Sequence, residues 1–388
     1  MNQPIRILNL FTIMNRGGAE TMVMNYYRAM DKSKVQFDFM VHRQERGAYD
    51  DEIEAMGGRI YRMCPIYPQH MYTYKQLLRT FFNEHSEYRI LHSHMSELGY
   101  FAFKEAARHG IPVRICHAHN APVFSSETPI EKMKRIPREI LARKMRQLAT
   151  DFFCCSQVAG DWLFGKRNRN KMIFMRNAID AERFSYSLEK SQQAKESFHW
   201  QNKTVIGHVG RFCPQKNHEF LIDIFNAYHQ KHSESILVLV GSGELQDKIR
   251  AKVSRLNLSD SVLFLGNRSD MNQLYWAFDL FLFPSFYEGL PVSLVEAQAA
   301  GLPCVISDTI STQTKITSGF HPVSIKQGAN HWVAEIEVMI QQKRTKTLEQ
   351  IKQAGFDIQE NAKWLSHYYL TKYNDYESTT RIHHCSHL

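Results

Sequence analysis

Two glutamates in the second half of the chain have the side-chain type and spacing to hold hydroxyl groups. Glu288 and Glu296 lie in SFYEGLPVSLVEAQAAGLPCVISD, residues 285–308. We expect Glu288 in a loop and Glu296 about one turn into a helix, with Pro291 in the first turn of that helix. A helix start offers free N–H groups and a positive dipole end, which suit a phosphate. The carboxylates could accept hydrogen bonds from hydroxyls at opposite ends of a nucleotide sugar. Alternatively, Glu296 is a first-turn glutamate that interacts favourably with the helix dipole, and Glu288 is an unrelated loop residue.

Two further loops carry groups that suit an anion. Arg211 and Lys216 stand in GHVGRFCPQKN, just after an expected strand, and two cations beside a helix start suit a diphosphate. Gly17 and Gly18 stand in MNRGGAE, where the absence of side chains permits close approach of the backbone to an anion. Taken singly, the two cations could be solvated surface and the two glycines a simple turn.

Histidines follow two expected strands in the first half of the chain. His119 ends the His-x-His of CHAHNAP, and His117 is the alternative functional residue within that motif. His92 and His94 repeat the spacing one strand earlier. These side chains could contact a ligand at the strand ends, or they are polar residues that merely terminate strands.

Short apolar runs alternate with helix-length segments throughout the chain, and these elements must position the groups above. The expected strands are Ile5–Leu10, Gln36–Val41, Ile90–His92, Val113–His117, Asp151–Cys155, Thr204–Val209, Ile236–Val240, Val262–Leu265, Leu280–Phe283 and Pro303–Ile306. The expected helices of the first half are Glu20–Met30, Asp50–Met56, Thr73–Glu84, Ser96–Gly110 and Ile130–Ala149. This alternation predicts parallel sheets with helices on both faces.

The polar stretch between the two sets of strands predicts a division into domains. We expect a first domain at 1–180, a linker at 181–203 and a second domain at 204–358. Residues 359–388 should form a closing helix with one apolar face, near 360–376, followed by a tail.

Composition limits the class of protein. The net charge is +9, and residues 1–180 hold all of the excess, with 27 Lys+Arg against 18 Asp+Glu. Basic patches attract nucleic acid, anionic lipid or phosphorylated substrates. The seven cysteines are odd in number and scattered, which is typical of a reduced cytoplasmic protein. No apolar run is long enough for a membrane-spanning helix, and we interpret the first apolar stretch as a strand, not as a signal peptide.

The motifs together resemble glycosyltransferase family 4, especially the bacterial enzymes of exopolysaccharide and capsule synthesis. Glu288 and Glu296 match the Glu-x7-Glu signature, and the resemblance runs from GGAE to about residue 310. It implies the GT-B fold, in which two Rossmann-like βαβ domains with parallel sheets face a central cleft and the closing helix packs back on the first domain.

The resemblance also implies roles for individual residues. Arg211 and Lys216 would bind the donor diphosphate and stabilise the departing nucleotide, and His119 would contact the donor sugar near the reacting carbon. Glu288 would hold the sugar and Glu296 the ribose. The remaining donor-binding residues would be Gly17, Gly18, Arg268, Met271, Gly289 and Leu290.

The expected activity is that of a retaining hexosyltransferase that uses a UDP-sugar. No Asp-x-Asp triplet occurs, although metal-dependent sugar transferases commonly use that spacing, so we expect no metal and no other cofactor. Arg211, Lys216 and helix N-termini would neutralise the leaving group instead.

A basic segment of the first half suggests where the acceptor binds. Residues 131–149 interleave apolar side chains with a basic set that includes Lys132, Lys134, Arg135 and Arg138. Such a helix is typical of membrane surfaces, although an ordinary solvated helix has the same composition. With the resemblance, it suggests a polyprenyl-diphosphate-linked saccharide acceptor and peripheral contact with the inner face of the cell membrane.

Two other classes remain open. One is another GT-B enzyme, such as a nucleotide-sugar epimerase or a phosphorylase, against which the complete Glu-x7-Glu with Arg211 and Lys216 argues. The other is a non-catalytic nucleic-acid-binding protein, which the basic first half suggests but no recognised nucleic-acid module supports.

Overall fold

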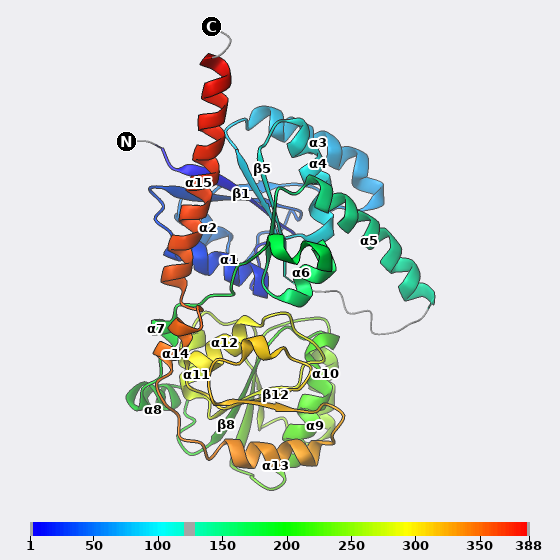
Figure 1. The fold of residues 1–388 in the computed structure, drawn as a ribbon. Coiled ribbons are helices and arrows are strands. Elements are labelled where there is room, and N and C mark those ends of the chain that lie inside the picture. The colour runs from blue at the N-terminus through cyan, green and yellow to red at the C-terminus, as the bar shows by residue number, and fades with distance from the viewer. Residues whose placement is uncertain (1–2, 120–128, 386–388) are drawn as a thin grey trace. The chain divides into compact units, whose positions relative to one another are not determined.

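The computed structural model describes residues 3–119 and 129–385 of the 388, with the side chains of 129–135 and 379–385 left out. The chain divides into two compact units, Met1–Arg176 with Ile358–Leu388, and Asn177–Asp357. Each unit is built on one parallel sheet, as the alternation of strands and helices predicts (Figure 1).

The first unit has a seven-stranded sheet in the order β3-β2-β1-β4-β5-β6-β7. The strands are β1 (Ile5–Phe11), β2 (Val35–Val41), β3 (Ile60–Arg62), β4 (Ile90–Ser93), β5 (Val113–Ala118), β6 (Asp151–Cys154) and β7 (Met172–Phe174). The helices are α1 (Gly18–Ala29), α2 (Asp50–Ala55), η1 (Pro68–His70), α3 (Met71–Glu84), η2 (Ser96–Gly99), α4 (Tyr100–Arg108), α5 (Pro129–Leu148), α6 (Gln157–Phe164), η3 (Lys166–Lys171) and α15 (Ile358–Cys385).

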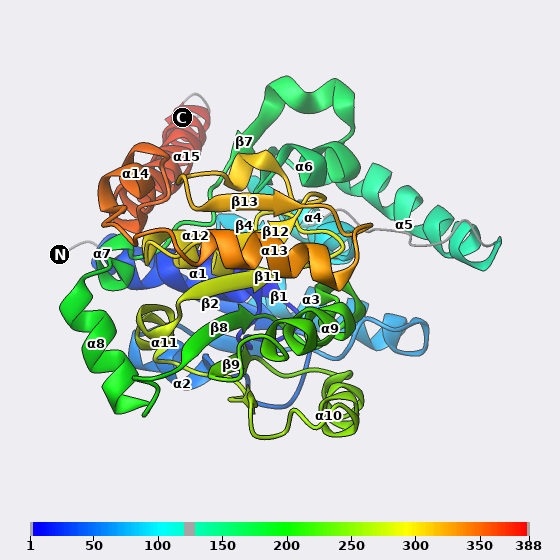
Figure 2. The same cartoon turned by 90° about the horizontal axis from the view of Figure 1, so that it is seen from below.

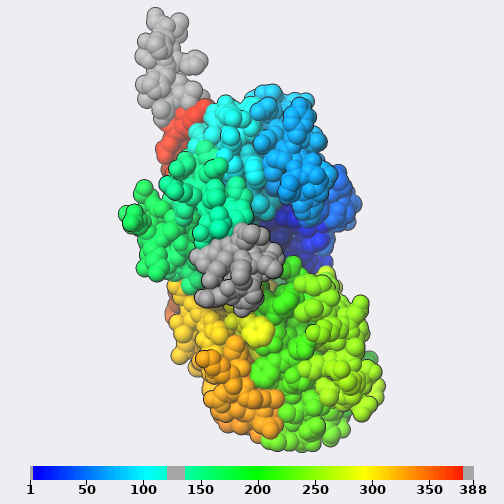
Figure 3. All heavy atoms as spheres, turned by 90° about the vertical axis from the view of Figure 1, so that its right-hand side faces the viewer, coloured from blue at the N-terminus to red at the C-terminus, as the bar shows by residue number. Residues whose placement is uncertain are grey.

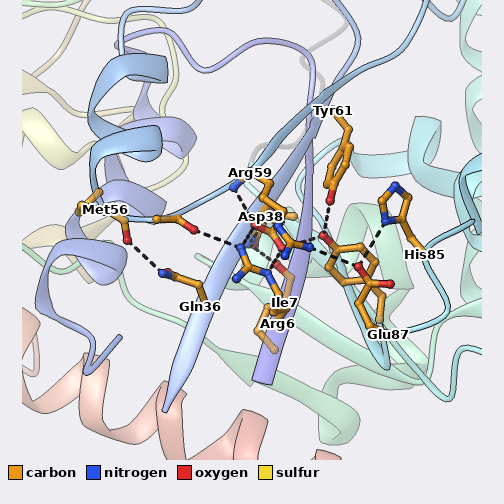
Figure 4. Close-up of polar contacts among 12 residues, drawn as sticks. Arg6, Ile7, Gln36, Asp38, Met56, Arg59, Tyr61, His85 and Glu87 are labelled. Carbon is orange, nitrogen blue, oxygen red and sulfur yellow. Dashed lines mark hydrogen bonds and ion pairs between the residues drawn. The ribbon is translucent and has the colours of Figure 1, made fainter. Parts of the chain in front are cut away.

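A buried carboxylate joins two strands of this sheet to the segments that precede two others. Asp38 on β2 is fully buried and accepts hydrogen bonds from Arg6 Nε at 2.6 Å and from the Arg59 backbone N–H at 2.7 Å. The Tyr88 hydroxyl donates to it at 2.6 Å. Figure 4 shows Arg6, Asp38 and Arg59 meeting at this point. Because every strong acceptor site of the carboxylate is used, the charge is tolerated in the core.

The closing helix belongs to the first unit. α15 packs against α1 (Figure 1), and Tyr369 on its apolar face is fully buried 5.9 Å from the Phe37 ring of β2. Asp151 at the start of β6 accepts from the Tyr368 hydroxyl at 2.5 Å and pairs with Lys372 at 2.6 Å. One face of α15 therefore supplies both apolar and charged contacts to the sheet.

The second unit has a six-stranded sheet in the order β10-β9-β8-β11-β12-β13. The strands are β8 (Thr204–Val209), β9 (Ser235–Val240), β10 (Val262–Phe264), β11 (Leu280–Phe283), β12 (Cys304–Ser307) and β13 (Phe320–Val323). The helices are α7 (Ala181–Phe184), α8 (Leu188–Ser197), η4 (Pro214–Lys216), α9 (His218–His229), α10 (Gln246–Arg255), α11 (Met271–Ala277), α12 (Val292–Ala299), η5 (Thr312–Thr314), α13 (Ala329–Met339) and α14 (Leu348–Gln353).

Both faces of the second sheet are buried, as continuous apolar strands predict. Leu237 of β9 and Leu282 of β11 pack with α9, α10 and α13 in one cluster, in which Trp332 is the largest side chain. On the opposite face, Phe281 lies 6.0 Å from the Tyr275 ring of α11. Figure 2 shows α13 and α9 on the near side of β8, β11 and β12.

The expected linker at 181–203 is wrong in detail. Those residues form α7 and α8 and belong to the second unit. Ser187 caps α8, and Lys195 pairs with Asp279 at 2.7 Å. The segment is polar because one face of α8 is solvated, while local capping and extensive packing against α11 fix its position.

None of the helices in the ranges that the structure describes has the length and apolar character needed to cross a bilayer.

Candidate active site

The two glutamates of the signature lie in the second unit in different environments. Pro291 directly precedes α12, and Glu296 lies within that helix with 9% of its surface exposed. Glu296 Oε2 is 3.0 Å from the Tyr275 hydroxyl of α11. Burial is the largest influence on the pKa of Glu296 and raises it to about 7, while the hydrogen bond from Tyr275 lowers it.

Glu288 lies in the loop before α12 and is already paired. Lys216 Nζ is 2.7 Å from Glu288 Oε1, and Gln215 Nε2 donates to Glu288 Oε2 at 3.1 Å. Both partners in the ion pair are largely buried. The lysine and glutamate that the sequence assigns to diphosphate and sugar are therefore brought together by the fold.

The loops that carry this ion pair are clamped to each other through the backbone. Phe286 N–H donates to Gln215 O at 2.9 Å, and Gln215 Nε2 donates to Tyr287 O at 2.9 Å. Asn217, in the left-handed region at φ 53°, donates from Nδ2 to Pro284 O at 3.1 Å. The sequence analysis missed Gln215 and Asn217; an asparagine directly before a helix was the available signal, since asparagine tolerates this conformation.

Two glycines of the second unit allow the turn GSGE, residues 241–244, to pack closely against the loop that carries Arg211 and Lys216. A Cβ on Gly241, at φ 132°, would lie 2.2 Å from Gly210 O, and one on Gly243 would lie 2.5 Å from Phe212 O. The GSGE turn thus supports the backbone from which Arg211 projects.

The two cations of that loop differ in their surroundings. Arg211 is exposed, and its guanidinium makes no hydrogen bond or ion pair with any residue that the structure describes. Lys216, in contrast, is mostly buried, paired with Glu288 and 4.7 Å from the centre of the Phe283 ring. Arg211 can therefore meet an incoming anion without breaking an existing pair.

The loop that carries the expected donor-binding residues Arg268 and Met271 contains an internal ion pair. Arg268 Nε and Nη2 contact the two Asp270 oxygens at 2.8 and 2.5 Å. Asp270 precedes α11, which begins at Met271, but its side chain makes no capping bond. The Asp270 carboxylate does not cap the helix, because the Arg268 guanidinium pairs with both of its oxygens. Gly266 at φ 63° opens this loop.

The remaining donor residues of the second unit flank Glu288. Leu290 is buried, and its carbonyl accepts a hydrogen bond from the Asn177 side chain. Gly289 is partly exposed beside it. These contacts anchor the loop on its C-terminal side.

In the first unit, the paired glycines begin a helix. Gly17 precedes α1, and the Glu20 carboxylate folds back so closely that a Cβ on Gly17 would lie 2.3 Å from it. A Cβ on Gly18 would meet nothing within 4 Å. Of these two glycines, Gly18 is therefore the one that faces open space.

Four histidines gather at the ends of β4 and β5. His117 and His119 stack at 4.1 Å, His92 and His94 at 4.3 Å, and His94 Nδ1 is 2.9 Å from His119 Nε2. His92 Nδ1 contacts the Tyr369 hydroxyl of α15 at 2.7 Å. Burial lowers the pKa of His92 and of His119 to about 3, so both rings are neutral at neutral pH.

Three of these rings have the composition of a metal site but not its geometry. Ring nitrogens of His92, His94 and His117 lie within 4.8 Å of one another. The planes of His92 and His117 are 16° apart and those of His92 and His94 26° apart. Each ring binds a metal in its own plane, so stacked rings direct their lone pairs side by side and do not converge on a tetrahedral ion.

The basic helix α5 reaches the surface of the first unit (Figure 3). Arg138 pairs with the buried Glu97 at 2.5 Å and lies over the Trp162 ring. The guanidinium of Arg138 therefore already makes contacts within the first unit, in addition to the role expected of it in binding an acceptor. Lys132, Lys134 and Arg135 have side chains outside the described residues.

Comparisons with known proteins identify the family. Residues 16–183 match the family model "Glycosyltransferase Family 4", and residues 189–357 match "Glycosyl transferases group 1". The glycosyltransferase EpsF of Bacillus subtilis is 37% identical over 365 residues, covering 92% of this chain and 94% of the relative.

Two other proteins are informative. An Escherichia coli protein named UDP-Gal:alpha-D-GlcNAc-diphosphoundecaprenol alpha-1,3-galactosyltransferase is 27% identical, over 57% of this chain and 58% of its own length. The crystal structure of HepE from Anabaena in complex with UDP and glucose superposes with a TM-score of 0.74 at 18% identity, over 95% of this chain and all of that one.

Two parallel-sheet α/β domains with this likeness define the GT-B fold of glycosyltransferases. The chain belongs to glycosyltransferase family 4.

Proposed function

We propose that this glycosyltransferase moves a hexose from a UDP-sugar to a hydroxyl of a lipid-linked saccharide, with retention at the anomeric carbon and without a metal ion. The observation that carries the donor assignment is the second-unit cluster of Arg211, the Lys216–Glu288 pair and buried Glu296. It offers cations for a diphosphate and carboxylates for hydroxyl groups. HepE, which shares the fold, binds UDP and glucose.

The donor diphosphate would lie at the start of α12, between that helix terminus and the two cations. Arg211 would contact it directly, and Lys216 would turn from Glu288 toward the phosphate oxygens. Glu288 would then accept a hydrogen bond from a sugar hydroxyl, and Glu296 from a ribose hydroxyl. Arg211 would need no existing ion pair broken to stabilise charge on the diphosphate, whereas Lys216 would first exchange Glu288 for the phosphate oxygens.

In the reaction, the acceptor oxygen forms a bond to the anomeric carbon as the bond from that carbon to the diphosphate oxygen breaks. The acceptor proton passes to the departing diphosphate on the same face, which gives retention. Arg211 and Lys216 offset the negative charge that develops on UDP, and this replaces the divalent ion of metal-dependent transferases.

The acceptor proposal rests on a relative and on the basic helix. The Escherichia coli protein is named for an acceptor linked to diphosphoundecaprenol. The described part of α5 has Ile136 and Ile140 exposed among basic side chains, as in helices that lie on anionic membranes. Exopolysaccharide or capsule assembly at the inner membrane face is the process that fits both.

Thermal stabilisation by nucleotides tests the donor assignment. Purified protein in chelator is heated with UDP, GDP, ADP and a series of their sugar conjugates. We expect UDP and one UDP-sugar to raise the midpoint of one transition, because a ligand that binds only the folded state stabilises it. Arg211→Ala should abolish the shift, while Arg255→Ala, which removes an exposed arginine at the end of α10, should preserve it.

No shift with any nucleotide would contradict the proposal. A shift that needs a divalent ion would contradict its metal-free part alone.

A further inference from the structure

Three side chains of the first unit form one hydrogen-bonded chain that ends at His119. Asn9 Oδ1 on β1 is 3.3 Å from His94 Nε2, and His94 Nδ1 is 2.9 Å from His119 Nε2. His94 directly follows β4 and His119 directly follows β5. The chain therefore runs across the carboxyl ends of neighbouring strands toward the residue that the donor sugar is proposed to meet.

The position of Asn9 sets the direction of the hydrogen bonds. Its Nδ2 lies 3.3 Å from Ile7 O and 3.4 Å from Asp38 O, so the amide nitrogen faces two acceptors and the oxygen faces His94. An amide oxygen only accepts. His94 Nε2 must therefore carry the hydrogen.

The same logic continues to His119. Burial keeps the pKa of His94 well below its ordinary value, so the ring is neutral and has one N–H. With that hydrogen on Nε2, His94 Nδ1 is an acceptor, and His119 Nε2 must donate to it. His119 is neutral as well, because burial lowers its pKa to about 3. Its Nδ1 then carries a lone pair and no hydrogen, and has no hydrogen-bond partner among the residues that the structure describes.

Packing holds the middle ring in the orientation that this chain requires. His94 is stacked between Phe11, at 4.5 Å and 9°, and His92, at 4.3 Å and 26°. A ring sandwiched in this way cannot turn out of its plane without losing both contacts. The chain is thus fixed by packing as well as by its two hydrogen bonds.

We propose that Asn9 and His94 are positioning residues that hold His119 in the tautomer with hydrogen on Nε2 and the lone pair on Nδ1. His119 can then only accept a hydrogen bond at Nδ1. The group it meets must carry a hydrogen, so it is a hydroxyl of the sugar donor or acceptor and not a phosphate oxygen. The contact with sugar rests on the proposed function, whereas the tautomer does not.

The tautomer is measured on the full chain without ligand. Histidine-labelled protein is studied by ¹⁵N NMR correlation of ring nitrogens with ring protons, and the His119 signals are assigned as those missing from His119→Gln. The proposal requires Nε2 protonated and Nδ1 unprotonated. The opposite tautomer, or a protonated ring at neutral pH, overturns it whether or not the protein transfers sugar.

Variants of the middle residue test the relay. His94→Phe keeps the stack and removes both hydrogen bonds, so the His119 tautomer should become mixed. His94→Gln retains one donor and one acceptor and should restore the wild-type signal. His92→Phe, the same change two residues earlier and within β4, is the matched control and should leave the His119 signal unchanged. An unchanged His119 signal in His94→Phe overturns the proposal.

Kinetics separate positioning from folding. In folded His94→Phe, kcat should fall on the order of tenfold, the effect of one misplaced hydrogen bond, while UDP affinity stays unchanged. Recovery of kcat in His94→Gln excludes a merely structural role. If the wild-type protein transfers no sugar but the tautomer is as stated, the proposed function fails and this assignment stands.

Discussion

Replacing Glu296 with glutamine should stabilise the empty protein while weakening its nucleotide binding. The carboxyl is buried in α12, and that burial raises its pKa from 4.5 to about 7. Between these two pH values the folded chain keeps a proton that the unfolded chain has released. Stability is therefore lost as the pH rises through this window, because the unfolded state is the one that ionises freely.

The magnitude follows from the separation of the two pKa values. A separation of about 2.5 pH units corresponds to about 3 kcal/mol of unfolding free energy above pH 7, at about 1.4 kcal/mol per unit. Glutamine cannot ionise and still offers an oxygen to the Tyr275 hydroxyl. We expect Glu296→Gln to lie within about 1 kcal/mol of the wild type in stability near pH 5 and to exceed it by about 2–3 kcal/mol at pH 8.

Differential scanning calorimetry of the full chain at both pH values measures the effect. The transition that UDP raises belongs to the unit that holds Glu296. For a unit of this size, 2–3 kcal/mol should raise that midpoint by about 5–10 °C at pH 8. Glu349→Gln on α14, the same change at an exposed position, should leave it in place at both pH values.

Binding should respond in the opposite sense. If ionised Glu296 accepts ribose hydroxyl hydrogens, Glu296→Gln should weaken UDP binding about tenfold at pH 8. As the pH is lowered below 7, the affinity of the wild type for UDP should decrease more steeply than that of the variant. The variant should show only the effect of UDP's own titration. A stability difference that is equal at pH 5 and pH 8, or a less stable variant at pH 8, would refute the reasoning from burial.

Three further outcomes are expected. Glu288→Gln should transfer sugar at least about a hundredfold more slowly than the wild type. Calorimetric titration should show that it binds UDP as well as the wild type or better, because Lys216 no longer has an anionic partner; weakened UDP binding would instead place Glu288 on the nucleotide. Asp38→Ala should lower the unfolding free energy, measured by urea titration, by about 3 kcal/mol, because it leaves Arg6 and Tyr88 without their buried acceptor. A loss below about 1 kcal/mol would show that water replaces the carboxylate. Arg143→Glu on the exposed side of α5 should reduce sedimentation with anionic vesicles and not with neutral ones; unchanged sedimentation would remove the membrane role of that helix.

Sequence patterns predicted the central strands of both sheets because those strands are long enough and apolar enough to be recognised. β3 and β7 were missed, and each has only three residues at the edge of the first sheet. β13 was missed because its sequence, FHPV, includes proline and a polar residue, which an edge strand accepts and a central strand does not. The helices α7 and α8 were assigned to a linker since their composition is polar throughout.

The chemical types of the site residues could be predicted, but their partners could not. The spacing of His92, His94, His117 and His119 indicated two strand ends with facing histidines. The register that aligns Ser93 with Cys116, and so brings His94 beside the second pair, is set by packing of the whole sheet. Asn9 is eighty-five positions from His94 in the chain, and no local pattern connects the two.

The pairing of charges at the proposed donor site indicates how a transferase that works without a metal, as we propose, would keep its cations in place without disturbing the fold. Lys216 is paired with Glu288 and Arg268 with Asp270, so each cation is held by an acid of the same unit until a ligand competes. Arg211 lacks such a partner among the described side chains and is exposed. In the proposed function Arg211 would attract the diphosphate first, and the proximity of that anion would then draw Lys216 from Glu288. The carboxylate is thereby released at the moment a sugar hydroxyl is available to it. On this argument the order of events, diphosphate before sugar, is set by the difference in pairing between Arg211 and Lys216.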